Sequence, residues 1–296
     1  MMIRCLALTF LICCAASAAA VHSSPVTAVT VEPKVLVNGA VCLFTAQVAG
    51  HPQKVSAQWL EHELTFSPGQ DDKWYALAGV AYETKPGTYD LDIRVEQGDG
   101  QVSHSLQPVT VKAATYKTWR LTVPQKYVTP GPETLKRIEA EREIKKEAFA
   151  HFIPVPDWSG DFIAPVSLAI SENYGTSRTF NGKLASLHSG TDFRAPAGTP
   201  VHASNDGEVI LARELYYEGN CVVIDHGLGF MTMYMHLSKL DVKMGDKVKK
   251  NEVIGLSGGT GRVTGPHLHM AVRWSGLYLD PVKLLGLELP ETPYVR

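Results

Sequence analysis

The sequence predicts a mostly β protein in which two β-rich regions are joined by a single helix. Three features of the chain support this fold class. Short runs of β-branched and aromatic residues separated by turn signals fill 25–124, a segment rich in Glu, Lys, Arg and Ala follows at 133–150, and glycine-rich β runs resume near 154. The length of 296 residues suits one large domain or two medium ones. We therefore expect an N-terminal β-sandwich-like domain, a linking helix and a C-terminal β domain.

The first twenty residues have the pattern of a targeting segment. Arg4 supplies a short basic region, an apolar run extends from Cys5 to Ala16, and small residues end at Ala20. A membrane-spanning helix needs about 20 apolar residues, and this run is shorter. We expect 1–20 to be a signal peptide, with an uncleaved anchor as the alternative. We therefore expect a periplasmic or secreted protein that has no integral membrane segment after the signal peptide is cleaved.

Composition excludes several classes of protein. Hydrophobic residues make up 45% and charged residues 20%, which is typical of a globular chain. The formal net charge is −2 and no Lys/Arg block forms a phosphate-binding patch, so no nucleic-acid partner is expected. Three of the five cysteines lie in 1–20. Cys42 and Cys221 fall in different predicted domains, so we expect two small apolar side chains packed in strands and no disulfide.

The predicted N-terminal domain covers 21–128. Residues 89–95 alternate strictly between apolar and polar side chains, which is typical of a half-buried strand. Turn signals recur at 67–69, 85–87 and 98–100. Short strands at this spacing favour a β-sandwich of about 100 residues. The scattered histidines of this region form no ligand cluster, so we interpret it as a packing, positioning or inhibitory module.

A linking helix is predicted within 129–153. Pro132 and Glu133 form a favourable helix start, because proline has no N–H to leave unpaired and the acid faces the positive end of the helix. The apolar positions of 133–150 form an incomplete stripe. This pattern indicates a connecting helix that is mostly solvated.

The predicted C-terminal domain covers 154–296 and is again β. Strands are expected at 207–211, 220–225 and 230–235, with a hairpin turn at 226–229.

Four polar stretches in this domain are candidates for chemistry. They are His188-Ser189-Gly190-Thr191-Asp192, Tyr234-Met235-His236-Leu237, Gly265-Pro266-His267-Leu268-His269 and the loop 178–182. Alternate residues of a strand point to one face, so His267 and His269 should lie side by side. Each stretch alone also fits an ordinary half-buried or surface histidine. Catalytic zinc takes three N/O protein ligands and leaves one open position. Two histidines and one carboxylate meet that count and leave two histidines for acid–base or oxyanion roles.

Together these motifs resemble the lysostaphin/LytM-type metallopeptidases, the M23 family. The shared pattern is H-x-x-x-D, then Tyr-x-His-Leu, then Gly-Pro-His-Leu-His. Framework segments stand in the expected order, namely 198–201, 206–207, 225–227, 245–248 and 258–261. The resemblance covers about 160–285, and ordered matches at this many places are highly specific.

The resemblance implies a role for each of these positions. His188, Asp192 and His269 match the family's zinc ligands, so the implied cofactor is Zn²⁺. His236 and His267 match its catalytic histidines. Asn181 stands where members often carry a polar residue near the cleft, and it is expected to bind substrate. The implied fold is a small antiparallel β domain with its site in a groove.

The resemblance and the predicted export imply a zinc metalloendopeptidase that hydrolyses peptide cross-links of bacterial peptidoglycan. A D,D-endopeptidase is favoured, because neither a wall-sorting tail nor wall-binding repeats are evident. Two alternatives stay open. The chain could be a non-enzymatic LytM-type regulator of other wall hydrolases, or a latent enzyme autoinhibited by its N-terminal domain or by the 178–182 loop.

Overall fold

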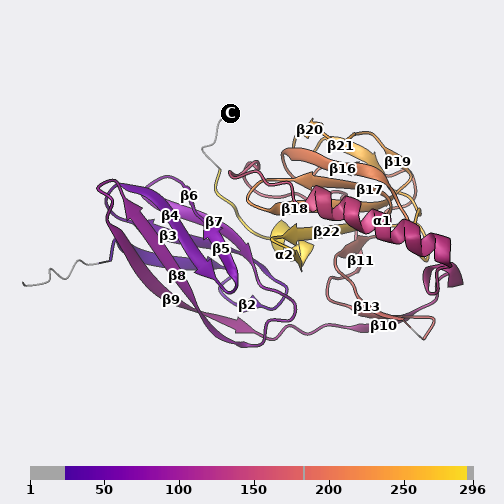
Figure 1. Ribbon diagram of the computed structural model, residues 1–296, viewed down its shortest axis with the longest axis horizontal. Helices are drawn as coiled ribbons and strands as arrows, with labels where there is room; N and C mark the ends of the chain where they lie inside the picture. Colours follow the sequence, from indigo (N-terminus) through magenta and orange to yellow (C-terminus); the bar gives the residue numbers. More distant parts are fainter. Residues whose placement is uncertain (1–23, 183, 292–296) are drawn as a thin grey trace, which may run out of the picture.

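The computed structural model describes residues 24–182 and 184–291 of the chain, and the expected signal peptide at 1–20 lies outside this part. Figure 1 shows two β-rich halves side by side, with one long helix on the second half. The predicted mostly β fold class is confirmed. Within the described residues, no helix has both the length and the apolar character that crossing a bilayer requires.

The N-terminal half contains two facing sheets. One sheet has the order β1 (Val26–Glu32), β3 (Val41–Val48), β7 (Lys73–Gly79) and β6 (Ser67–Pro68); the other has the order β2 (Leu36–Val37), β9 (Val102–Lys112), β8 (Gly87–Gln97), β4 (Pro52–Trp59) and β5 (His62–Thr65). Phe44 of the first sheet packs edge-on against Trp59 of the second, with ring centroids 5.1 Å apart. Leu91, Ile93 and Val95 are buried, as the alternation in 89–95 predicts.

The chain then crosses to the second half as an extended linker. Strand β10 (Thr118–Leu121) pairs in parallel with β12 (Ser177–Phe180), which pairs with β13 (Leu184–Leu187). A short 3-10 helix (Gln125–Tyr127) and helix α1 (Pro132–Phe149) follow. The sequence placed the end of the N-terminal domain at residue 128. Strand β10 lies before that residue but already belongs to a sheet of the second half.

Helix α1 covers one face of the second half's main sheet. Its Ile144, Ala148 and Phe149 pack against a buried cluster that includes Cys221 and Met233. The incomplete apolar stripe is therefore a packing edge, and the rest of the helix is largely exposed. Cys42 and Cys221 are both buried free thiols, as predicted.

The main sheet of the second half is antiparallel. Its order is β11 (Ile170–Glu172), β14 (Thr191–Phe193), β22 (Leu268–Trp274), β18 (Phe230–Leu237), β17 (Gly219–Asp225), β16 (Gly207–Leu215) and β20 (Lys247–Val248), with β23 (Leu277–Leu279) also on β22. A smaller sheet has the order β15 (Pro200–His202), β21 (Val253–Leu256) and β19 (Lys239–Leu240). Every residue of β18 is buried, so this central strand is a rigid support for whatever it carries.

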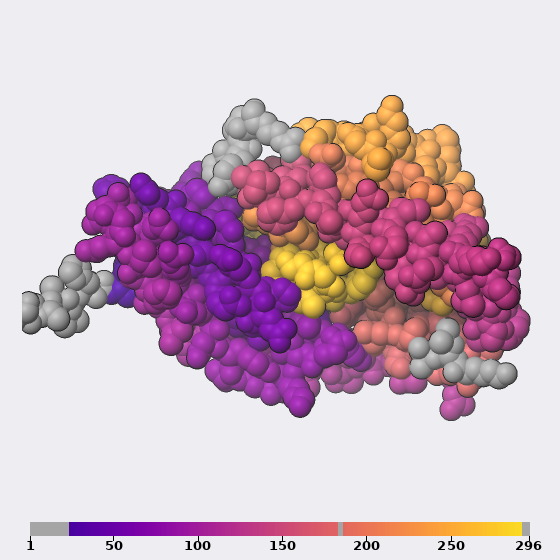
Figure 2. Space-filling view, viewed as in Figure 1, coloured from indigo at the N-terminus to yellow at the C-terminus, as the bar shows by residue number. Residues whose placement is uncertain are grey.

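The two halves share one apolar core. Leu279, just before helix α2 (Pro281–Leu285), packs so closely on Gly79 that a Cβ there would lie 2.5 Å from its Cδ1. The rings of His62 and Trp274 pack against each other across the same contact, tilted by 51° with ring centroids 4.9 Å apart. Figure 2 shows this C-terminal segment, in yellow, filling the space between the halves.

Candidate metal centre and cleft

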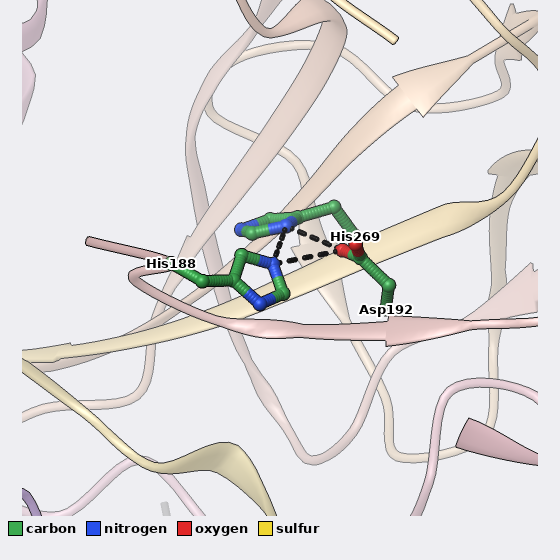
Figure 3. Close-up of side chains that lie close together, drawn as sticks. All are labelled: His188, Asp192 and His269. Atoms are coloured by element: carbon green, nitrogen blue, oxygen red, sulfur yellow. Dashed lines mark hydrogen bonds and ion pairs between the residues drawn. The ribbon is translucent and has the colours of Figure 1, made fainter. Parts of the chain in front are cut away.

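His188, Asp192 and His269 bring three donor atoms together at one point (Figure 3). Nε2 of His188 lies 3.0 Å from Nδ1 of His269 and 3.0 Å from Oδ1 of Asp192. Nδ1 of His269 lies 2.7 Å from the same carboxylate oxygen. All three residues are buried. The structure thus assembles the three residues that the sequence singled out as ligands.

Local strand geometry explains this convergence. Asp192 of β14 is directly opposite His269 of β22 in the antiparallel register. His188 precedes β14 and is fixed by its backbone N–H, which donates to the Thr176 carbonyl at 2.8 Å. Gly190 lets the strands approach, because a Cβ there would lie 2.2 Å from the Met270 carbonyl oxygen and 2.5 Å from Nε2 of His269. The glycine inside the H-x-x-x-D motif is therefore required by close contact.

The donor chemistry fits a tetrahedral metal ion. Nδ1 of His188 lies 2.9 Å from the Asn173 carbonyl, an acceptor, so Nδ1 carries the proton and Nε2 keeps its lone pair. Burial lowers the pKa of His269 to about 4, which keeps this ring neutral at pH 7. Ligands about 2.0–2.1 Å from a zinc ion lie roughly 3.3 Å apart. The observed triangle is only slightly tighter than that.

Arg178 holds the other oxygen of Asp192. Its guanidinium donates to Oδ2 of Asp192 at 2.7 Å and to both oxygens of Glu172 at 2.7 Å. Only 16% of the Arg178 side chain is exposed. Such charge-assisted, bidentate bonds fix both direction and charge. Oδ1 of Asp192 is thereby oriented toward the two histidines.

His236 and His267 complete the site. Nδ1 of His236 donates to the Thr260 carbonyl at 2.8 Å, and Nδ1 of His267 donates to the Gly265 carbonyl at 2.8 Å. Each ring therefore keeps a lone pair on Nε2. Nε2 of His267 lies 3.7 Å from Oδ1 of Asp192. The ring centroids of His236 and His267 are 5.0 Å apart.

His236 is held in an unusual backbone conformation with φ of +64°. A non-glycine residue in this region carries strain that the surrounding structure must support. Burial also lowers the pKa of His236 to about 3, so it is a neutral acceptor near pH 7.

These five side chains line one cleft of about 570 Å³. Its walls come from β12, from the 258–266 loop and from the linker, which contributes Trp119, Leu121 and Val123. A segment from before α1 therefore forms part of the rim.

Asn181 has a different place from the one expected. Its amide donates to the Val123 carbonyl at 2.9 Å and accepts from the Val123 N–H at 3.0 Å. It sits at the β12–β13 turn with φ of +51° and does not line the cleft. The amide is already paired with the linker and fastens it to β12, and the expected substrate contact of Asn181 stays a prediction.

Sequence reasoning missed Glu172, Arg178 and the linker as parts of the site. Arg178 belongs to the polar stretch 178–182, in which only Asn181 was expected to contact the substrate. The available signal was an acid and an arginine flanking the H-x-x-x-D motif on its N-terminal side. Their pairing depends on how β11 and β12 pack, and that has no local sequence signature.

The region that holds this site is similar to known proteins. The profile of peptidase family M23 matches residues 186–281. The chain is 54% identical over 122 residues to peptidoglycan DD-endopeptidase ShyA of Vibrio cholerae, covering 41% of this chain and 28% of that protein. It is 46% identical over 105 residues to DD-carboxypeptidase/endopeptidase Mpg of Neisseria meningitidis, covering 36% and 24% respectively. The chain thus spans less than a third of the length of these curated relatives.

The likeness to solved structures extends beyond the site. An M23 structure from Pseudomonas aeruginosa has a TM-score of 0.63 and 30% sequence identity, covering 84% of this chain and 95% of that one.

Proposed function

Since the chain belongs to peptidase family M23, we propose that it is a zinc metalloendopeptidase that hydrolyses peptide cross-links of bacterial peptidoglycan, with D,D-endopeptidase specificity. One observation carries the proposal. Three buried donors converge on one point while two further histidines, each with Nδ1 bonded to a carbonyl oxygen, line the same cleft. Similarity to the peptidoglycan DD-endopeptidase ShyA supports the substrate, and similarity to both ShyA and the DD-carboxypeptidase/endopeptidase Mpg supports the bond. The predicted signal peptide and this substrate point to a periplasmic or secreted location.

The roles of the residues follow from their protonation. His188, Asp192 and His269 would hold the zinc ion, which supplies Lewis acidity to a carbonyl oxygen and to water. His236 and His267 each offer an Nε2 lone pair in the cleft, and their Nδ1 protons are fixed by carbonyl oxygens. One of them takes a proton from the attacking water as general base. The same ring, now protonated, gives that proton to the leaving amine, and the other histidine can donate to the oxyanion only when its own Nε2 has taken a proton from solvent.

The proposal is tested by digesting cross-linked sacculi with the mature chain, residues 21–296. We expect cross-linked dimers to become monomers, chelator to stop this and zinc to restore it. His236→Ala and His267→Ala should keep zinc bound and lose turnover. His104→Ala is the matched control, because this histidine lies on the exposed surface of the N-terminal half. Release of monomers by both cleft variants at the wild-type rate would refute the assigned roles.

Latency is a second candidate, favoured by the linker at the cleft rim. Asn181 fastens Val123 with two hydrogen bonds, and Trp119 and Leu121 lie on the same rim. If the linker restricts entry, Asn181→Ala should loosen it and raise the rate on sacculi severalfold. An unchanged or lower rate, with normal folding and zinc content, would argue against latency. Bound zinc without any cutting by wild type or N181A would favour the regulator alternative.

A further inference from the structure

One arginine of the cleft has no partner of its own. The Arg262 guanidinium lies between two aromatic rings, 4.8 Å from the ring centroid of Phe180 and 4.6 Å from that of Tyr217. No side chain or backbone group within residues 24–182 and 184–291 forms a hydrogen bond or an ion pair with the Arg262 guanidinium. Arginine stays charged in proteins and offers five N–H donors. This cation is therefore held rigidly with its donors unused.

Its position is built into the backbone. The N–H of Arg262 donates to the Tyr217 carbonyl at 2.9 Å, which fixes the 258–266 loop against the turn that precedes β17. Gly219 and Gly261 permit this approach. A Cβ on Gly219 would lie 2.2 Å from the Thr260 hydroxyl oxygen, and a Cβ on Gly261 would lie 2.4 Å from the Gly219 nitrogen. Loop and turn thus place the guanidinium in the wall of the cleft.

The other charged groups nearby are already paired. Arg178 is bound by Glu172 and Asp192. Glu218, which also lines the cleft, is paired with Lys145 of α1 at 2.5 Å. Burial lowers the pKa of the Arg262 guanidinium, and the nearby Tyr217 and Glu218 act in the opposite direction. An incoming anion would displace no direct ion pair at Arg262, because Glu218, whose charge acts on this guanidinium, is already bonded to Lys145.

We propose that Arg262 forms an anionic subsite that binds a free carboxylate of the substrate peptide next to the scissile bond. The planar fork of a guanidinium matches a carboxylate with two parallel hydrogen bonds, and stacking on Phe180 and Tyr217 fixes its plane in advance. This inference rests on the proposed function. Two carboxylates of a cross-link have this chemistry: the one left free on the diamino acid and the one at the end of the stem peptide.

The test uses three synthetic cross-linked peptides with the zinc-loaded mature enzyme. One has all carboxylates free, one is amidated at the diamino acid, and one is amidated at the C-terminus. Wild type should lose about 10- to 100-fold in kcat/KM on one amidated peptide only, because a charge-assisted pair has that effect. The sensitive peptide identifies the carboxylate.

Arg262→Met keeps the packing between the rings and removes the donors. It should lose the same factor on the free peptide and nothing further on the sensitive amidated one. Arg273→Met is the matched control, because Arg273 also stacks on a ring, 4.2 Å from the Phe149 centroid, but does not line the cleft. Equal losses by R262M on all three peptides would overturn the subsite.

Two other outcomes separate the subsite from the proposed function. If wild type cuts all three peptides equally, the subsite is wrong while the peptidase stands, and this measurement does not depend on whether R262M folds. If zinc-loaded wild type cuts none of the peptides and no sacculi, the proposed function fails and the subsite with it.

Discussion

Replacing Arg178 with methionine tests the account of the buried charges. The guanidinium donates three hydrogen bonds of 2.7 Å to Glu172 and Asp192, which are only 8% and 6% exposed. Removing one member of a buried charge cluster leaves carboxylates without compensation and costs about 3–5 kcal/mol. In Arg178→Met, Glu172 and Asp192 would lose their shared cation. We therefore expect the free energy of unfolding of the metal-free protein to fall by about that amount.

The assay is urea unfolding in chelator, followed by tryptophan fluorescence. Zinc affinity is a poorer measure, because losing Arg178 both removes a repulsive cation and disorders Asp192. Added zinc should recover part of the loss, because the ion supplies positive charge to Asp192. Arg194→Met, which removes an exposed arginine, should stay within about 0.5 kcal/mol of wild type. A loss below about 1 kcal/mol for R178M would show that Arg178 is not needed to compensate the buried charges of Glu172 and Asp192.

Three further results are expected. Gly190→Ala should lower zinc affinity at least tenfold, because the new Cβ would lie 2.2 Å from the Met270 carbonyl oxygen and displace His269. Gly131→Ala is the control, since Gly131 has open space around it. A zinc titration of G190A that matches wild type would contradict this expectation. Burial lowers the pKa of His226 to about 4 from an unfolded value near 6.5, so the stability it contributes is full above pH 6.5 and is lost toward pH 4. That loss is about 3 kcal/mol, and His226→Gln should flatten the pH profile of unfolding; identical profiles would exclude His226 as the cause. Zinc at 100 times its Kd should raise the free energy of unfolding by about 2.7 kcal/mol for wild type but not for His188→Ala. If calorimetry shows the same stabilisation by zinc for both proteins, the metal binds elsewhere.

Parts of this structure were predictable from the sequence because they follow local periodicity or motif spacing. Alternation in 89–95 predicted a half-buried strand, and Leu91, Ile93 and Val95 are its buried face. The His-x-His spacing predicted two side chains on one face, and both His267 and His269 approach Asp192.

Other parts depend on contacts between distant segments. Asn181 looked like a cleft residue, but its partner Val123 is 58 residues away and reaches it only because the linker adds a parallel strand to β12. Arg178 and Glu172 pair across two short strands whose packing has no local signal. The same holds for Arg262, whose place depends on contacts of Gly219 and Gly261 with distant backbone.

Whether this chain is a zinc peptidase is tested most directly by measuring bound zinc and released muropeptides on the same preparations of wild type, His188→Ala and His267→Ala. We expect one zinc ion per chain in wild type and H267A, none in H188A, and monomer release from sacculi by wild type alone. Cutting by metal-free H188A, or wild-type cutting by H267A, would contradict it.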